Sequence, residues 1–179
     1  MQEQIPMTII HQNEKKNRTF YHDEKHNYNV YDIPNIVAVL PILPNGNVVL
    51  VEQYRVPAAT RTLELVCGGI EVGEKPEKAA VREVKEEIGY LVSSYVSVGH
   101  YVSCPAYTTE RVYVFLAFLN KESIGQQLEE HEVLHNLQKV EVSVDEALLL
   151  CQTKDVRPDL ELALMKYKEY LLFNEKTPS

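Results

Sequence analysis

The sequence has little of what several large protein classes require. Its 18 Lys and Arg residues face 26 Asp and Glu residues, a formal net charge of −8. Because nucleic-acid backbones are bound by clustered basic side chains, no nucleic-acid partner is expected. No apolar run is long enough to cross a bilayer, so no membrane partner is expected either. The three scattered cysteines form no Cys-x-x-Cys pair, which argues against a disulfide framework and a zinc site.

The beginning of the chain also lacks the pattern of a secretory leader. Residues 1–10 contain no basic segment followed by an apolar run, so a cytoplasmic protein is expected. The 179 residues show no internal repeats or low-complexity tracts, and 45% of them are hydrophobic. This length and composition predict one globular domain with a substantial core.

Hydrophobic periodicity predicts an α+β fold. A helix is expected from Pro76 to Gly89, and a long polar loop over 120–138. Two more helices are expected at 144–152 and 157–173, followed by a frayed tail at 174–179. Strands are predicted at 8–11, 18–22, 27–31, 36–43, 48–54, 61–66, 91–102, 111–119 and 139–143. This order predicts helices on either side of a mixed sheet.

The most informative stretch is GGIEVGEKPEKAAVREVKEEIGY, residues 68–90. On the predicted helix, Glu83, Glu86 and Glu87 are spaced i, i+3 and i+4 and therefore share one side. Like charges at this spacing repel, whereas a hard divalent cation such as Mg²⁺ takes carboxylate oxygens and substrate phosphates as ligands. The pattern indicates part of a phosphate-binding metal site. The alternative is a solvated acidic face among neighbouring lysines.

The complete spacing resembles the Nudix box, Gly-x5-Glu-x7-Arg-Glu-U-x-Glu-Glu-x-Gly-U, where U is apolar. The positions that match are Gly68, Glu74, Arg82, Glu83, Val84, Glu86, Glu87, Gly89 and Tyr90. The resemblance implies an α/β/α sandwich with a mixed sheet and a Mg²⁺-dependent hydrolase, with Mn²⁺ as a second usable metal. Its substrate would be a nucleoside diphosphate linked to another moiety.

Three further segments resemble the ADP-ribose pyrophosphatase branch of that family. The strand VVLVEQYR ends at Arg55 and leads into Glu64-Leu65-Val66-Cys67-Gly68, where the branch carries Glu-Leu-Pro-Ala-Gly. The loop Ser103–Glu110 places Pro105 at the branch's marker position after the box. The acidic run at 129–132 lies where the branch has a catalytic glutamate. Relatives that hydrolyse GDP-mannose and other nucleotide sugars share these features, so the substrate stays open between them.

The resemblance also implies roles for individual residues. Metal ligands are expected at Glu83, Glu86 and Glu87 and at the backbone carbonyl of Cys67, and substrate contacts at the three residues Arg55, Pro105 and Glu110. The expected catalytic residues are Glu132, Glu129, Glu86 and Arg82. Glu132 is favoured as the base, Glu129 comes next, and Glu86 on the box helix is the alternative. Arg82 is expected to pair with Glu74.

A homodimer is expected, because the branch exchanges N-terminal strands between subunits. Residues 1–33 would form this antiparallel extension, which aids dimerisation and could contact substrate, and residues 34–179 the Nudix domain. With ADP-ribose the products would be AMP and ribose 5-phosphate. A ligand-binding regulator without catalysis is the alternative, although such proteins usually have a damaged box.

Overall fold

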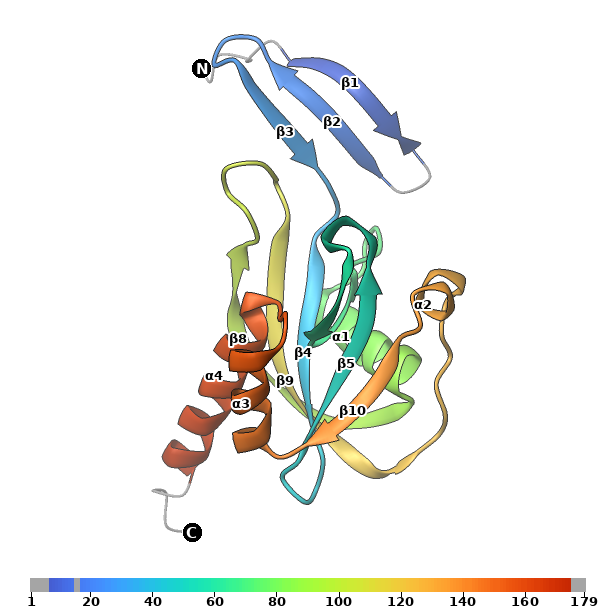
Figure 1. The fold of residues 1–179 in the computed structure, drawn as a ribbon, viewed down its shortest axis with the longest axis vertical. Helices are drawn as coiled ribbons and strands as arrows, with labels where there is room; N and C mark the ends of the chain where they lie inside the picture. Colours follow the sequence, from blue (N-terminus) through green and yellow to red (C-terminus); the bar gives the residue numbers. More distant parts are fainter. Residues whose placement is uncertain (1–6, 15–16, 175–179) are drawn as a thin grey trace.

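The computed structural model describes residues 7–14 and 17–174. A three-stranded sheet projects from an α/β body, as Figure 1 shows. The expectations for the start of the chain and for the C-terminal tail fall largely on residues 1–6 and 175–179, outside the described residues. No described helix is long and apolar enough to span a membrane.

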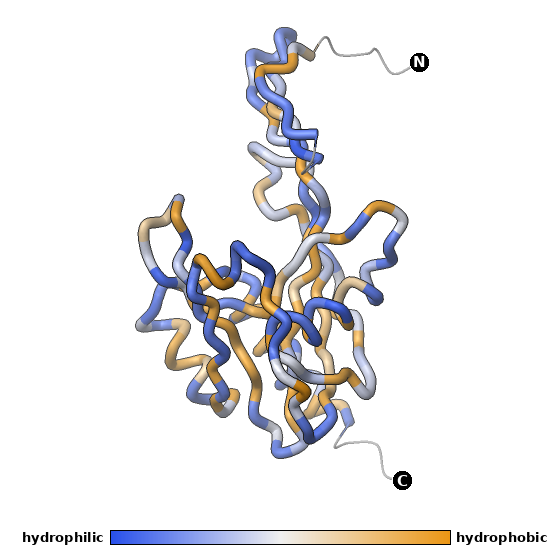
Figure 2. The backbone as a smooth tube through the Cα atoms, turned by 90° about the vertical axis from the view of Figure 1, so that its right-hand side faces the viewer, coloured by the Kyte–Doolittle hydropathy of each residue, from blue (hydrophilic) through white to orange (hydrophobic). Residues whose placement is uncertain are grey.

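The projecting N-terminal sheet is antiparallel and consists of β1 (Met7–Asn13), β2 (Arg18–Asp23) and β3 (Tyr28–Asp32) in that order. Figure 2 shows it as a narrow arm in which hydrophilic and hydrophobic segments alternate. Every residue of β1 is exposed, and only Thr19 and Asp23 of this sheet are buried. The sheet therefore has almost no core of its own.

The body is built on a seven-stranded mixed sheet of order β10-β5-β4-β9-β8, with β6 paired to β5 and β7 paired to β4. Its central pair, β4 and β9, is parallel, whereas the other pairs are antiparallel. The strands are β4 (Ile36–Ile42), β5 (Val48–Arg55), β6 (Thr60–Glu64), β7 (Val66–Gly69), β8 (Tyr90–Val102), β9 (Arg111–Ser123) and β10 (Gln138–Val142).

Helices cover both faces of this sheet, which confirms the expected α/β/α sandwich. α1 (Pro76–Glu83) lies behind the sheet in Figure 1, and α3 (Val144–Thr153) and α4 (Pro158–Asn174) lie in front of it. Alternation along β4 divides the core between the two faces, since successive strand side chains point to opposite sides. Leu40 belongs to the cluster under α3 and α4, whereas Val39 belongs to the cluster under α1.

The helix that carries the box is α-helical in its first half and π-helical in its second. It begins at Pro76, whose missing N–H is not needed in a first turn, and is α-helical to Glu83. Val84–Ile88 then forms a π-helical turn that ends at Gly89, which is left-handed with φ 72°. A Cβ atom at Gly89 would lie 2.4 Å from the Gly125 carbonyl carbon, so glycine permits both the turn and this close approach.

The polar segment 120–138 is more structured than the sequence predicts. β9 continues to Ser123, and a short helix, α2, spans Glu130–Leu134. Glu129 and Glu132 form a capping box at the beginning of α2. A helix of five residues is too short to show a periodic apolar pattern, which is why the hydrophobic pattern predicted only a loop here.

Candidate functional site

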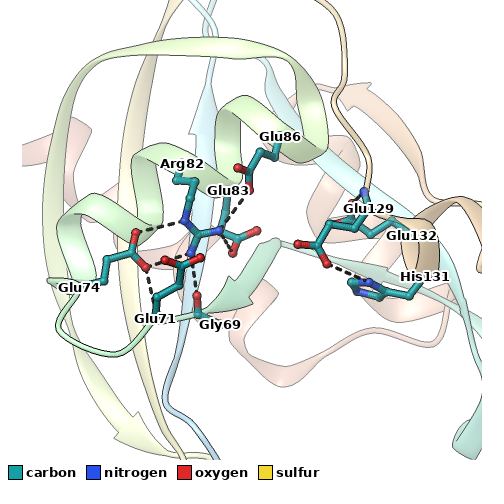
Figure 3. A network of polar contacts seen from close by, with 9 residues as sticks. All are labelled: Gly69, Glu71, Glu74, Arg82, Glu83, Glu86, Glu129, His131 and Glu132. Atoms are coloured by element: carbon teal, nitrogen blue, oxygen red, sulfur yellow. Dashed lines mark hydrogen bonds and ion pairs between the residues drawn. The ribbon is translucent and has the colours of Figure 1, made fainter. Parts of the chain in front are cut away.

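Arg82 is the centre of a hydrogen-bond network on the box helix (Figure 3). Its Nε and Nη2 atoms donate to the two carboxylate oxygens of Glu74, at 3.1 and 3.0 Å, and Nη2 also donates to the Gly69 carbonyl at 2.8 Å. Its Nη1 atom donates to Glu83 at 2.6 Å and to Glu86 at 3.1 Å. The expected pairing with Glu74 is therefore present. One guanidinium ties the loop before α1 to the helix and fixes the Glu83 carboxylate.

Three buried carboxylates, those of Glu83, Glu87 and Glu132, form an acidic cluster. One oxygen of each lies within 4.8 Å of the others. The first two come from the box helix, whereas Glu132 comes from α2. The Glu86 side chain, expected to share the metal-binding face, lies outside this group and pairs with Arg82 instead. The cluster thus unites the box helix with the distant acidic run.

Burial makes the ionised form of these three carboxyl groups less favourable and so raises their pKa values. It raises the pKa of Glu83 to about 7, although the adjacent Arg82 opposes the shift. Burial, followed by the charge of Glu83, raises the pKa of Glu87 well above its usual value, and burial also raises that of Glu132. Each charge disfavours the others, because like charges in a poorly solvated site favour protonation.

The acidic cluster fits a divalent cation. The Oε2 atom of Glu87 is buried and has no hydrogen-bond partner among the described residues, which is costly for a polar atom. All the side-chain donors in the cluster are carboxylate oxygens, the ligand type that Mg²⁺ and Mn²⁺ prefer. A bound cation would satisfy the orphaned oxygen and reverse the repulsion between the carboxylates.

Strand β7 leaves room for one of these carboxylates. A Cβ atom on Gly68 would lie 1.8 Å from the carboxyl carbon of Glu83, so the side chain of Glu83 occupies the space that any other residue would fill. The preceding residue, Cys67, adjoins the cluster, because its backbone amide lowers the pKa of Glu87 against the effect of burial. Burial raises the pKa of the Cys67 thiol well above its ordinary value, which leaves the thiol neutral.

The acidic run divides into one buried and two exposed glutamates. Glu132 is buried, and its Oε2 atom accepts a hydrogen bond of 2.6 Å from the Glu129 amide. The Glu129 carboxylate caps α2 in return and lies 3.2 Å from Nδ1 of His131, and Glu130 is exposed. The spacing of Glu129 and Glu132 was the one sequence signal that could have predicted α2.

Arg55, at the end of β5, is held by a buried carboxylate. Its Nε and Nη2 atoms donate to the two oxygens of Glu64, at 2.7 and 2.5 Å, and Thr62 also donates to Glu64. Glu64 is fully buried. The sequence pattern places Glu64 only in the turn that precedes the box and gives no sign of this contact, which joins residues of two neighbouring strands.

The remaining expected substrate contacts lie where the body meets the N-terminal sheet. Pro105 is exposed and Glu110 is half-buried, and both belong to the loop between β8 and β9. That loop accepts a hydrogen bond of 2.7 Å from the Tyr31 amide at the Tyr107 carbonyl and donates one of 3.1 Å from the Thr109 amide to the Tyr31 carbonyl. Within the described part of the chain, neither Pro105 nor Glu110 is hydrogen-bonded to the acidic cluster.

Comparison with known proteins agrees with this geometry. A NUDIX domain family model matches residues 33–162. The chain is 32% identical over 123 residues to an "ADP-ribose pyrophosphatase" of Bacillus subtilis, covering 69% of this chain and 65% of the relative, just under two thirds of its length. It is 30% identical over 135 residues to a "Methanol dehydrogenase activator" of Bacillus methanolicus, covering 75% and 71%. It is 27% identical over 151 residues to a "GDP-mannose pyrophosphatase" of Yersinia enterocolitica, covering 78% and 76%.

Substitution of Gly68 by alanine should weaken metal binding. The added methyl group needs the space of the Glu83 carboxylate, which must move away from Glu87 and Glu132. Displacement of a supporting contact typically costs about 10–100-fold in metal affinity. Gly69→Ala is the matched control, since its Cβ would meet nothing within 4 Å. Titration with Mn²⁺ followed by electron paramagnetic resonance measures both affinities, and equal affinities would contradict this placement of Glu83.

Without a divalent cation, the protein should lose stability as the pH rises. The folded state raises the carboxyl pKa values of the cluster above the ordinary value of 4.5, to about 7 for Glu83, and so binds protons more tightly than the unfolded state. This stabilisation is complete below about pH 4.5 and disappears through about pH 7. The shift of Glu83 alone corresponds to a loss on the order of 3 kcal/mol in the free energy of unfolding.

Urea unfolding from about pH 5 to pH 8, with a chelator or with Mg²⁺, measures this effect. Mg²⁺ should stabilise the protein more at the higher pH, where the carboxylates are ionised. The Glu87→Gln variant separates the cluster from other titrating groups, because its metal-free stability should vary less with pH. A wild-type profile that matches this variant would rule out the assignment.

Proposed function

The chain belongs to the Nudix family, and from this premise we propose that it hydrolyses the diphosphate bond of ADP-ribose or a related nucleoside diphosphate sugar with a divalent cation. The products are a nucleoside monophosphate and a sugar phosphate. The observation that carries this proposal is the buried cluster of Glu83, Glu87 and Glu132, in which one oxygen of Glu87 has no partner among the described residues. The names of the Bacillus subtilis and Yersinia enterocolitica relatives support the substrate class.

The box helix supplies the cation site. Glu83 and Glu87 would hold Mg²⁺ or Mn²⁺, with the carbonyl of Cys67 as a further ligand, and Glu86 would join them by exchanging Arg82 for the cation. When bound, the cation neutralises diphosphate charge and makes water easier to deprotonate. Arg82 keeps the Glu83 carboxylate in place through its 2.6 Å hydrogen bond and pulls the loop before α1 against the helix.

The proton of the attacking water goes to Glu132. One oxygen of Glu132 is fixed by the Glu129 amide, so the other oxygen is the one that serves as the base. Burial raises its pKa above the ordinary value, which makes it a stronger base than an exposed glutamate. A bond then forms from the water oxygen to phosphorus, while the bond from phosphorus to the bridging oxygen breaks. The leaving phosphate takes the electron pair, and Arg55 shares the charge that develops there.

Product analysis tests the proposed function directly. The protein is incubated with Mg²⁺ and ADP-ribose, and we expect AMP and ribose 5-phosphate in equal amounts by chromatography. A panel with GDP-mannose, ADP-glucose and dinucleoside polyphosphates identifies the preferred substrate. Binding of ADP-ribose without turnover of any member of the panel, with either Mg²⁺ or Mn²⁺, would instead establish a ligand-binding regulator.

Removal of the proposed base should separate turnover from binding. Glu132→Gln should lower kcat by about 10²–10⁴-fold, because general-base catalysis contributes factors of this size. ADP-ribose affinity, measured with Ca²⁺ as a substitute metal, should change much less. Glu130→Gln is the control, since Glu130 is an exposed neighbour on the same helix. If Glu132→Gln keeps its turnover, Glu129 and then Glu86 become the candidates.

We also propose that residues 1–33 mediate a homodimer and that residues 34–179 form the hydrolase domain. A three-stranded sheet needs a covered hydrophobic face for stability. Met7, Ile9 and Ile10 are instead about half-exposed in a single chain, at 48%, 54% and 53%. A second copy that packs on this sheet would cover them, and the loop around Pro105 lies beside it. All three cysteines are unpaired, which supports a reducing, cytoplasmic location.

Light scattering measures the assembly. We expect a mass of twice the 20.5 kDa chain at micromolar concentration. An Ile9→Glu variant should shift the mass toward the monomer, because it places a charge in the covered face. Gln12→Glu is the control, since Gln12 is an exposed polar residue on the same strand. A monomeric wild type would eliminate the homodimer.

A further inference from the structure

A second arginine is held in the same manner as Arg55, at the beginning of α4. The Nε and Nη2 atoms of Arg157 donate to the two oxygens of Asp159, at 3.2 and 2.8 Å. Asp159 is 1% exposed and also accepts a hydrogen bond of 3.0 Å from the Tyr101 hydroxyl. Both arginines therefore present the same edge to a buried carboxylate. Such two-point contacts fix the plane of a guanidinium as well as its position.

The two arginine pairs lie close to each other. Val156 forms a parallel bridge with Leu63, whose amide donates to the Asp155 carbonyl at 2.9 Å. The segment before α4 thus runs beside β6, the strand that carries Glu64. In Figure 1 the beginning of α4 and the tip of β5 both lie toward the N-terminal sheet. The two guanidiniums are brought together at one end of the body.

The charges of these groups act on one another. Cys67 lies beside Arg157, but because its thiol is neutral, the charges of Asp159 and Glu64 are the ones that raise the pKa of Arg157. Glu64 raises the pKa of Arg55, whereas Arg157 opposes that shift. Two cations that repel each other are thus held near the same residue, Cys67. Because the Cys67 amide also acts on Glu87, this residue connects the arginines with the acidic cluster.

Each arginine keeps donors for a ligand. Neither Nη1 atom donates a hydrogen bond to a described residue, and the side chains of Arg55 and Arg157 are 35% and 26% exposed. Oriented guanidiniums with free N–H groups match the oxygens of phosphates. Structural support for α4 explains the contact with Asp159, but it does not explain why a second cation is kept beside Arg55.

We infer that Arg157 is a second substrate-binding guanidinium, which together with Arg55 holds the phosphates of a nucleoside diphosphate substrate. This inference rests on the proposed function. The cation at the acidic cluster and the two arginines would approach the diphosphate from different sides. Asp159 and Tyr101 act as positioning residues, since they orient Arg157 and do not themselves touch the substrate.

Binding of inorganic pyrophosphate tests the inference without any turnover. Calorimetry is performed with a chelator at about pH 6.5, below the pKa of about 7 at Glu83, so that repulsion from the cluster is reduced. Arg157→Lys keeps the positive charge but loses the paired N–H donors of the planar guanidinium, and it should weaken pyrophosphate binding about tenfold. Lys166→Gln is the control, because it removes a charge from a partly exposed side chain elsewhere on α4, where Lys166 pairs with Glu169 at 2.7 Å. Its affinity should equal that of the wild type.

Kinetics provide the second measurement. Arg157→Lys should raise KM for ADP-ribose about tenfold and change kcat less, since the contact is made before and during the reaction. Asp159→Asn keeps Arg157 but removes the two-point contact that orients its guanidinium. This variant should therefore also weaken pyrophosphate binding. This variant serves as the test if Arg157→Lys does not fold, as judged by its thermal unfolding.

The outcomes separate this inference from the proposed function. Pyrophosphate binding that depends on Arg157, in a protein that cleaves no nucleotide sugar, would support the anion site and refute the hydrolase. A wild type that binds no pyrophosphate would overturn the inference. It would equally be overturned by folded Arg157 and Asp159 variants that bind pyrophosphate and ADP-ribose as the wild type does.

Discussion

The carboxylates of Glu83, Glu87 and Glu132 repel one another inside the protein, and the surrounding structure is organised to hold them there. Among the described residues, Arg82 is the one cationic side chain that donates a hydrogen bond to a carboxylate of this cluster, and that carboxylate belongs to Glu83. Gly68 provides the space for that carboxylate. The buried Oε2 atom of Glu87 has no hydrogen-bond donor among the described residues. Unpaired buried charge costs several kcal/mol, so a site of this composition is stable when a cation completes it.

The same constraint explains how a residue distant in sequence reaches the box helix. After β9, the chain turns beside the helix end, where the Gln126 side chain donates to the Glu87 carbonyl at 2.6 Å and the Gln127 amide donates to the Glu86 carbonyl at 2.8 Å. Gly89 allows the two backbones to approach, and Gly125 adopts the left-handed conformation of the turn, with φ 88°. The capping box then orients Glu132 toward the cluster. The box helix, the segment after β9 and α2 are therefore one structural unit.

Much of this arrangement is encoded locally and could be predicted. Pro76 and Gly89 mark the ends of the box helix, and Ser143 caps α3 through the Glu146 amide as its spacing predicts. The pairing of Glu86 with Arg82 could not be predicted, because the π-helical turn alters the faces that an α-helical spacing assumes. Arg157 and Asp159 are two residues apart, but the position of this pair beside β6 depends on how α4 packs on the sheet, which no local pattern reports.

If the buried acidic cluster is a metal site, the binding of a metal ion should release protons. Mg²⁺ is titrated at pH 7 by calorimetry in two buffers with different ionisation enthalpies. Because the carboxyl pKa values of Glu83, Glu87 and Glu132 are raised, the metal-free cluster holds protons that the cation must displace. We predict a measurable release of protons in the wild type and a smaller one in Glu87→Gln. Tight binding without proton release, or no binding of Mg²⁺ or Mn²⁺, would contradict the account.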